Sequence, residues 1–218
     1  MKKIKRYIGY YGGKLLFLFR HIFRIVPVGG KYKFDKKYFA PRAFSNRNCM
    51  RLEAEKHAEL AKKAKKGIVE IGILYGDTSK VLANANPNIP VYGIDPIIMD
   101  SMSTTLIGNE ERIKNNTFSL KNFNFIKDFS YNVVKNWNKS FDYIFIDGSH
   151  IYEDVKKDFE DWFPLLEKGG IISFHDSTMY RGGMEYWPGP SHLADELIFD
   201  PRLDFVESVA RLTIFRKK

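Results

Sequence analysis

Short apolar runs alternate with amphipathic segments between Gly67 and residue 176. Five of these runs predict β-strands, at Ile68–Ile71, Val91–Ile94, Phe123–Ile126, Tyr143–Ile146 and Ile171–Phe174. Two intervening segments carry apolar residues at helical spacing: Thr78–Ala85, for which Asp77 is the expected N-cap, and Glu153–Phe163. Strands that alternate with helices form a parallel sheet with helices on both faces. The sequence therefore predicts an α/β fold.

The C-terminal part of the chain departs from this alternation. Leu203–Val209 and Leu212–Arg216 are two strand-like runs separated by little more than Ala210 and Arg211. This spacing predicts a hairpin that adds an antiparallel strand to the sheet. Residues 179–197 carry several Gly and Pro beside Tyr and Trp, so we expect a loop there that can act as a lid over a ligand.

Positive charge is concentrated at the N-terminal end. Residues 1–66 hold 19 Lys and Arg against 4 Asp and Glu, whereas residues 67–218 hold 16 against 22. We therefore divide the chain into a basic N-terminal helical arm, 1–66, and a domain, 67–218. The apolar run at 15–26 is interrupted by three basic side chains and is too short to span a bilayer. Residues 51–66 are expected to form a solvated helix.

Two alternatives stay open for the arm: packing on its own domain or on a partner subunit, and peripheral contact with an anionic membrane surface. The single cysteine, Cys49, excludes an internal disulfide and any cysteine-based metal cluster, which indicates a reducing compartment. We expect a cytoplasmic protein, with the inner face of a membrane as the site of any peripheral contact. The net charge of +9 invites a nucleic-acid partner, but the domain itself is mildly acidic, so we expect none. A homo-oligomer is left open.

Polar residues follow each predicted strand of the domain, at the edge where open α/β sheets bind ligands. They are Glu70, Gly72 and Gly76 around the first strand, Asp95 after the second, Asp128 and Ser130 after the third, Asp147 and His150 after the fourth, and His175 and Asp176 after the fifth. Glycines after a first strand allow a ligand to approach the backbone closely. Asp95 lies where a carboxylate accepts hydrogen bonds from ribose hydroxyls, so the pattern favours a nucleoside ligand.

Three segments, VEIGILYGDTS, VYGID and FDYIFIDGSHIYEDVKKDFEDWFPLLEKGGIISFHDS, carry a family resemblance. They resemble the motifs of class I S-adenosylmethionine-dependent methyltransferases, within them the group related to macrocin O-methyltransferase and the cephalosporin-hydroxylase-like proteins. The resemblance runs from about Gly67 to Asp176. It implies a Rossmann-like, doubly wound and mostly parallel sheet, with the antiparallel hairpin at its C-terminal end.

The resemblance also implies site residues. Glu70, Gly72 and Gly76 would line the methionine portion of S-adenosylmethionine, Asp95 would hold the ribose, and Ser130 would lie near the adenine. The family usually has a small residue at the position of Asp128 and an acid at that of Phe129, so this chain departs from the pattern around the adenine.

Transfer of a methyl group from a sulfonium needs a deprotonated or polarised nucleophile, which a general base or a bound metal can supply. Asp147 and Asp176 end neighbouring strands and offer oxygen ligands that suit Mg²⁺; His175 is a candidate third ligand that would also suit Mn²⁺, Fe²⁺ or Zn²⁺. His150 is a candidate base, with Asp147 as the second catalytic residue. The opposing interpretation is that His150 caps a helix and His175 lies in the core.

The sequence thus predicts a metal-assisted O-methyltransferase that acts on a hydroxyl of a sugar or glycosylated small molecule. Two alternatives remain. One is an RNA methyltransferase that holds phosphates with the basic arm, and the other is a non-catalytic, membrane-peripheral protein of the same fold.

Overall fold

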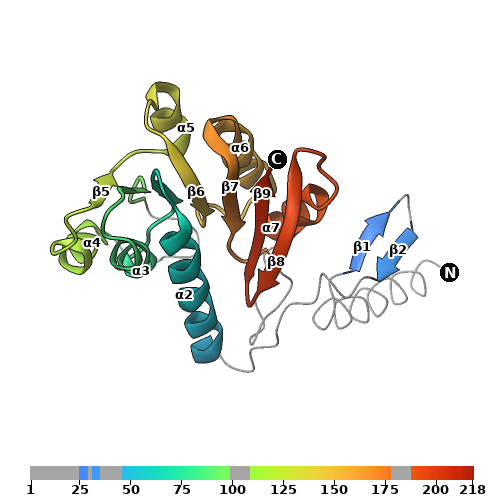
Figure 1. Ribbon diagram of the computed structural model, residues 1–218, viewed down its shortest axis with the longest axis horizontal. Helices are drawn as coiled ribbons and strands as arrows, with labels where there is room; N and C mark the ends of the chain where they lie inside the picture. The colour runs from blue at the N-terminus through green and yellow to red at the C-terminus, as the bar shows by residue number, and fades with distance from the viewer. Residues whose placement is uncertain (1–24, 29–30, 35–45, 99–108, 178–187) are drawn as a thin grey trace, which may run out of the picture.

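The computed structural model of this 218-residue protein describes residues 25–28, 31–34, 46–98, 109–177 and 188–218. In that part of the chain, an antiparallel pair of strands precedes a seven-stranded sheet flanked by helices (Figure 1). The strands are β1 Ile25–Val28, β2 Lys31–Phe34, β3 Ile68–Ile71, β4 Val91–Ile94, β5 Phe123–Ile126, β6 Phe141–Ile146, β7 Leu166–Phe174, β8 Leu203–Val209 and β9 Leu212–Lys217. The α-helices are α2 Asn46–Lys63, α3 Asp77–Ala85, α4 Asn109–Thr117, α5 Ser130–Val133, α6 Tyr152–Trp162 and α7 Pro188–Leu197, with 3-10 turns at Val134–Asn136 and Phe163–Leu165.

The order of strands in the large sheet is β5-β4-β3-β6-β7-β9-β8. The first five in this order are parallel, whereas β9 pairs antiparallel with both β7 and β8. The five predicted strands and the hairpin are confirmed, although β6 and β7 begin two and five residues earlier than predicted. The doubly wound, mostly parallel sheet predicted from the sequence is therefore confirmed.

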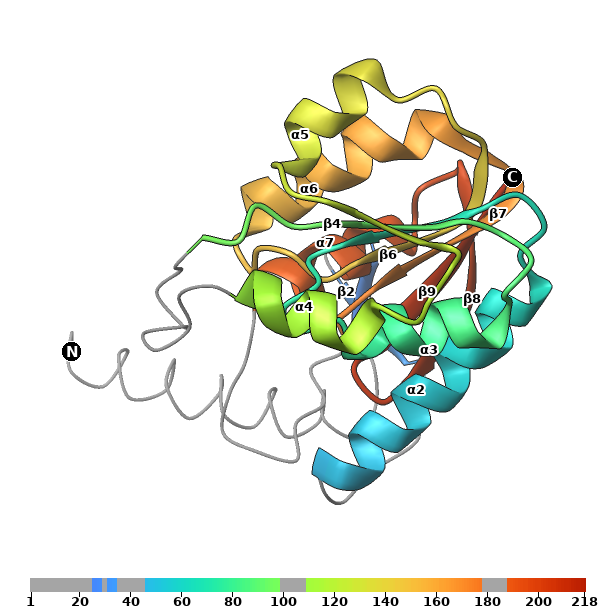
Figure 2. The same ribbon diagram turned by 90° about the vertical axis from the view of Figure 1, so that its left-hand side faces the viewer.

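Helices cover both faces of the sheet, with α5 and α6 on one side and α2, α3 and α4 on the other (Figure 2). Alternate residues of β6 show why: Ile144 and Ile146 join the core with α6 and α7, while Tyr143 and Phe145 join the core with α2 and α3. Side chains of a strand point alternately to opposite faces, so a central strand with apolar residues on both faces needs cover on both sides.

Helix α2 is not the solvated helix that we expected. Residues at a spacing of three or four, Cys49, Glu53, His57, Leu60, Ala61 and Ala64, are buried. The expectation was wrong because this stripe includes a glutamate and a histidine, which mask it in the hydrophobic pattern. Although the predicted boundary at residue 66 places α2 in the arm, Leu60, Ala61 and Ala64 belong to the same core as β3, β4 and β6.

Three other local expectations need correction. Gly76, in the left-handed conformation, occupies the N-cap position of α3, and Asp77 is the first residue of the helix. The expected lid is in part the helix α7, and residues 178–187 lie outside the described part of the chain. In the arm, Ile25–Val28 and Lys31–Phe34 pair as β1 and β2 where a helix was expected, and residues 1–24 are not described.

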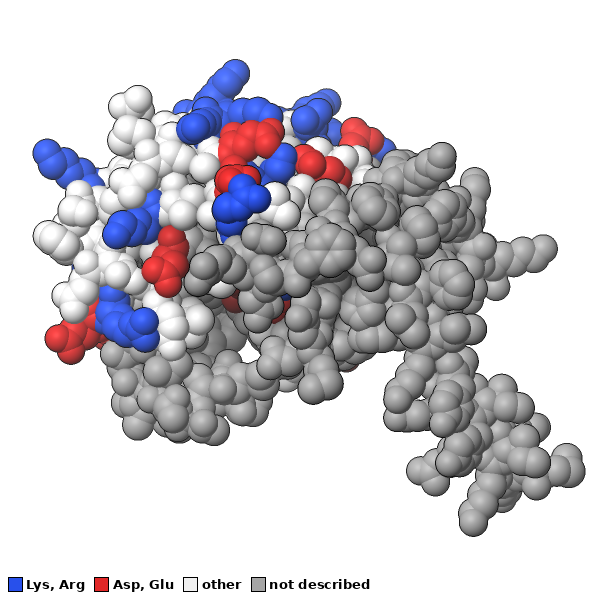
Figure 3. Space-filling view, turned by 90° about the horizontal axis from the view of Figure 1, so that it is seen from below, with Lys and Arg blue, Asp and Glu red and all other residues white. Residues whose placement is uncertain are grey.

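The described helices include none that is long and apolar enough to cross a membrane. On the face seen in Figure 3, the described Lys and Arg side chains lie beside Asp and Glu side chains and do not form one basic field.

Gly72, directly after β3, lies against Asp147, directly after β6. Its φ is +85°, and a Cβ atom there would lie 2.2 Å from the carbonyl oxygen of Asp147. Only glycine fits both the conformation and the space. The contact joins the loop after β3 to the end of β6, and so brings the residues that follow the two strands together.

We expect Gly72→Ala to destabilise the protein much more than Gly169→Ala. Gly169 also has a positive φ, +78°, but a Cβ there would meet nothing within 4 Å. The left-handed conformation should cost either alanine about 1–2 kcal/mol, and the clash should add roughly 1–3 kcal/mol at residue 72 alone. Urea unfolding of the two variants measures the difference, and equal losses would contradict the close packing.

Candidate functional site

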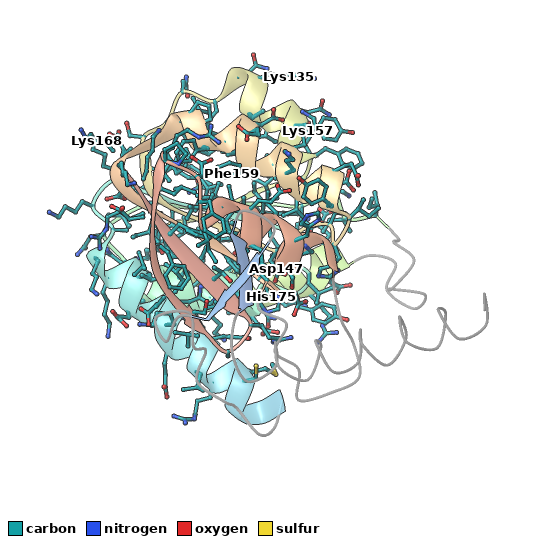
Figure 4. All side chains as sticks on the ribbon, turned by 90° about the vertical axis from the view of Figure 1, so that its right-hand side faces the viewer. Lys135, Asp147, Lys157, Phe159, Lys168 and His175 are labelled. Carbon is teal, nitrogen blue, oxygen red and sulfur yellow. The ribbon has the colours of Figure 1, made fainter. Side chains whose placement is uncertain are left out.

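The residues that follow β3, β4, β6 and β7 meet at one edge of the sheet, because these strands are parallel and neighbours. Figure 4 shows Asp147, after β6, next to His175, after β7, at this edge. Gly72 lies against Asp147, and Asp95 follows β4 on the other side of β3. The edge therefore has two parts, a loop region around Asp95 and a cluster around His175.

Asp95 holds the loop after β3 in place. Its Oδ2 accepts hydrogen bonds from the backbone N–H groups of Ile73 (2.8 Å) and Leu74 (3.2 Å), and its Oδ1 accepts one from Ile97 (2.8 Å). Leu74 and Ile97 both have positive φ angles, so the carboxylate stabilises two unusual backbone conformations. A carboxylate has about four acceptor positions. Counting only the residues that the structure describes, one position, on Oδ1, carries no hydrogen bond.

Glu70 is buried beneath this loop. Its carboxyl group accepts a hydrogen bond from the hydroxyl of Ser79, on α3. Burial, opposed by that hydrogen bond and reinforced by the negative charges of Asp147 and Asp95, raises the pKa of Glu70 to about 8. Glu70 is therefore largely protonated at neutral pH in the absence of a ligand.

The second part of the edge is a chain of imidazoles and carboxylates. His150 Nε2 lies 3.3 Å from Asp176 Oδ2, which lies 3.4 Å from His175 Nδ1, which in turn lies 2.9 Å from Asp147 Oδ1. The structure thus brings together all four residues that the sequence proposed for chemistry. His150 and Asp147 are the more exposed of the four, with 28% and 29% of their side chains accessible, whereas His175 and Asp176 are largely buried.

Glu53 approaches the same histidine from α2, and sequence reasoning missed it. Its Oε2 lies 3.5 Å from His175 Nε2. Arg211, in the turn between β8 and β9, binds both oxygens of Glu53, at 2.8 Å through Nε and 2.7 Å through a terminal nitrogen. The signal in the sequence was the buried stripe of α2, where Glu53 stands four residues from both Cys49 and His57.

These contacts fix the charges of the cluster. Burial disfavours the imidazolium, but the carboxylates of Asp147, Asp176 and Glu53 raise the pKa of His175 well above its ordinary value. Against the effect of burial, hydrogen bonds from His175 and Arg211 lower the pKa of Glu53 to about 2. Burial also opposes ionisation of Asp176, yet the two histidines lower its pKa. His175 is therefore an imidazolium that lies between the ionised carboxylates of Glu53 and Asp176.

Ser130, which the family resemblance expects near the adenine, is the first residue of α5. Its hydroxyl donates a hydrogen bond to Asp158, on α6. Burial, opposed by this hydrogen bond, raises the pKa of Asp158 to about 6. Ser130 is nearly buried, and Asp128 binds the backbone N–H of Phe129 and the side chain of Asn132. Ser130 is thus engaged with α6 as the structure stands.

A family model for a methyltransferase domain matches residues 69–177, half of the chain. The chain belongs to this methyltransferase family. The match contains the residues of both parts of the edge except Glu53 and Arg211, which contact the matched region from α2 and from the hairpin. The narrower resemblance to the macrocin group is taken up below as part of the proposed function.

Two curated proteins resemble this methyltransferase in part. It is 28% identical over 138 residues to an uncharacterized protein of Acanthamoeba polyphaga mimivirus, covering 59% of either chain. It is 35% identical over 68 residues to an uncharacterized protein of Sinorhizobium fredii, covering 31% of this chain and 7% of the relative. The chain thus spans less than two thirds of the length of the relatives it matches.

Solved structures share the fold. A methyltransferase of Podospora anserina, bound to S-adenosylhomocysteine, matches with a TM-score of 0.58 and 18% identity over 80% of both chains. A TDP-rhamnose 3′-O-methyltransferase of calicheamicin biosynthesis matches at 0.54 and 15%, over 79% of this chain and 81% of that one. An O-methyltransferase of Streptomyces achromogenes, in complex with S-adenosylmethionine, matches at 0.57 and 14%, over 76% and 79%.

The buried carboxyl group of Glu70 should make the methyltransferase less stable as pH rises. Because its pKa is raised from 4.5 to about 8 in the folded protein, the folded state holds the proton more tightly than the unfolded chain. This contribution is fully present below pH 4.5 and is lost as pH rises towards 8. Glu70→Gln keeps the shape of the side chain but cannot ionise. Between pH 5 and pH 9 its free energy of unfolding should therefore rise by about 2 kcal/mol or more relative to that of wild type. Thermal unfolding across this range measures the gain.

The matched control is Glu55→Gln, at an exposed position on α2. Its difference from wild type should not vary over the same range. A constant difference for Glu70→Gln as well would show that Glu70 ionises normally.

Proposed function

We propose that this protein transfers the methyl group of S-adenosylmethionine to a hydroxyl of a sugar or glycosylated small molecule. The observation that carries the proposal is that one sheet edge in a methyltransferase domain joins the loop held by Asp95 to the cluster of His150, Asp176, His175 and Asp147. The first part suits a nucleoside ligand, and the second supplies groups that can accept a proton.

The cofactor would lie across the loop after β3. Gly72 and Gly76 leave its backbone without side chains at two positions, and Glu70 lies beneath it. The acceptor position on Asp95 Oδ1 that no described residue occupies would take one ribose hydroxyl, and Ser130 would lie towards the adenine. The family membership and the cofactors named for the similar solved structures support this choice of ligand.

His150 is the proposed general base. Its side chain is accessible, and Asp176, on the protected side of the cluster, lies 3.3 Å from its Nε2. A carboxylate in that place stabilises the imidazolium that forms when the base takes the proton of the acceptor hydroxyl. The hydroxyl oxygen then attacks the methyl carbon, and the sulfonium leaves as a neutral thioether. Asp147, equally accessible, would orient the acceptor.

A divalent cation, Mg²⁺ first, is part of the proposal. Asp147, His175 and Asp176 would hold it, and when bound it would lower the pKa of the acceptor hydroxyl. The donors fit in kind: His175 Nδ1 faces both carboxylates, yet in the described part of the chain its ring N–H is not aligned for a hydrogen bond with either. As they stand, no three His, Cys, Asp or Glu side chains of the described residues are arranged so that they could hold a metal ion. A proton and a cation would therefore compete for this nitrogen.

The acceptor class is supported by two likenesses. The motifs resemble those of the macrocin O-methyltransferase group, and one protein of the same fold is a TDP-rhamnose 3′-O-methyltransferase.

Incubating the protein with methyl-labelled S-adenosylmethionine and a panel of nucleotide sugars and glycosides tests the proposal. Label transferred to a hydroxyl supports it, whereas transfer only to RNA or to nitrogen acceptors would overturn it.

Asp95→Ala should weaken binding of S-adenosylhomocysteine about tenfold or more, because a hydrogen bond to a charged group contributes roughly 1.5–3 kcal/mol. Since Asp95 also holds the loop, calorimetry should compare the parent ligand with an analogue that lacks the ribose hydroxyls. Wild type should discriminate between the two ligands, and the variant should not. Equal weakening towards both ligands would show that Asp95 acts on the loop alone.

Asp147→Asn should abolish methyl transfer and leave the affinity for S-adenosylhomocysteine within about twofold, because the cofactor would rest on β3 and β4. His150→Ala should lower turnover about 10²-fold or more. Asp204→Asn, at an exposed position on β8, is the control and should change neither quantity.

Full activity of His150→Ala would reject the base. Full activity in excess EDTA, with the absence of metal confirmed by elemental analysis, would reject the cation and leave His150 as the group that takes the proton.

A further inference from the structure

We infer that Glu53, held by Arg211, is a positioning residue that fixes the orientation of the His175 ring in the site. This inference rests on the proposed function for the meaning of His175 in the chemistry, but the arrangement itself can be tested without any methyl transfer. Neither Glu53 nor Arg211 belongs to the segment that matches the methyltransferase family model.

The first step concerns the proton on His175 Nε2. This nitrogen lies 3.5 Å from Glu53 Oε2. Because both oxygens of Glu53 accept hydrogen bonds from the guanidinium of Arg211, its carboxyl group is ionised and can only accept. His175 must therefore donate through Nε2–H, and Nδ1 is left facing Asp147 and Asp176. This assignment fixes which nitrogen of the ring faces the chemistry.

The second step concerns what holds Glu53. Both of its oxygens bind Arg211, in a planar two-point contact, and Oε1 also accepts the backbone N–H of Arg211 at 3.1 Å. Cys49 donates to Oε1 from the preceding turn of α2, at 3.3 Å. These partners hold the Glu53 side chain in one conformation, so the carboxylate that contacts His175 is fixed in place.

The third step concerns the reach of Arg211. One of its terminal nitrogens lies 3.7 Å from Asp176 Oδ1, so the same guanidinium faces the partner of His150. Arg211 is placed by a tight turn in which Ala210 has a φ of +49°. The hairpin thus supports both histidine–carboxylate contacts of the site, one directly and one through Glu53.

A carboxylate that holds the far nitrogen of a histidine is a common way to orient the near nitrogen towards a metal or a substrate. Loss of such a support typically lowers metal affinity or activity by about 10- to 100-fold. We expect changes of this size when Glu53 is removed.

The experiment uses the full chain labelled with ¹⁵N-histidine, and long-range ¹H–¹⁵N spectra that report separately on the protonation and proton exchange of each ring nitrogen of His175. In wild type, Nε2 should be protonated, and its proton should exchange slowly with water. A wild-type spectrum in which Nε2 carries no proton would overturn the inference, and no variant is needed for that outcome.

In Glu53→Ala, the Nε2 proton should exchange rapidly, and Mn²⁺, used alone as a probe, should bind about tenfold or more weakly. Glu53→Gln keeps an acceptor oxygen and should restore the slow exchange in part. Glu55→Ala, two residues along α2 and exposed, is the matched control and should behave as wild type. Circular dichroism checks that each variant is folded.

An unchanged His175 spectrum in folded Glu53→Ala would overturn the inference. If the spectrum changes as expected but Mn²⁺ binds neither protein, the positioning role stands and the cation of the proposed function fails. Arg211→Lys gives a second route, because Lys keeps the charge without the two-point contact. It should speed exchange of the same proton while Glu53 is still present, and unchanged exchange there would reject the role of Arg211.

Discussion

The close approach of β3 and β6 at Gly72 is the constraint on which the site depends. The carbonyl of Asp147 occupies the space that a side chain at residue 72 would need, so the loop after β3 contacts the end of β6. Asp95 then holds that loop from β4, and His175 extends the edge from β7. Four strands thus deliver their terminal residues to one place, although these residues are spread over more than one hundred positions of the chain.

Charge balance is the second organising feature. Three carboxylates, Glu53, Asp147 and Asp176, surround His175, and Arg211 lies against two of them. Removal of one partner from a buried set of charges leaves the others uncompensated, which is costly. Removal of any one of these charged side chains should therefore destabilise the arrangement of the others around His175.

The sequence predicts what is encoded locally. Strand period, the glycine turn and the polar residues after each strand lie in short segments, and the five parallel strands, the hairpin and the meeting of Asp147, His150, His175 and Asp176 follow from them. Helix α7 was missed because Pro188, Gly189 and Pro190 resemble a loop. Proline is tolerated in the first turn of a helix, where the missing N–H has no intrahelical partner. Gly189 packs against the carbonyl of His150, which no local pattern reveals.

Glu53 could not be predicted as a site residue because its partners are remote. The Glu53–Arg211 pair joins residues 158 positions apart. A nascent chain emerges from the ribosome N-terminal end first, at about 5–20 residues per second. Helix α2 and the first strands therefore appear many seconds before the hairpin turn, and during that interval Glu53 lacks its guanidinium partner. The Glu53–Arg211 contact can therefore form only once the hairpin of β8 and β9 has been synthesised, which couples completion of the site to the pairing of β9 with β7.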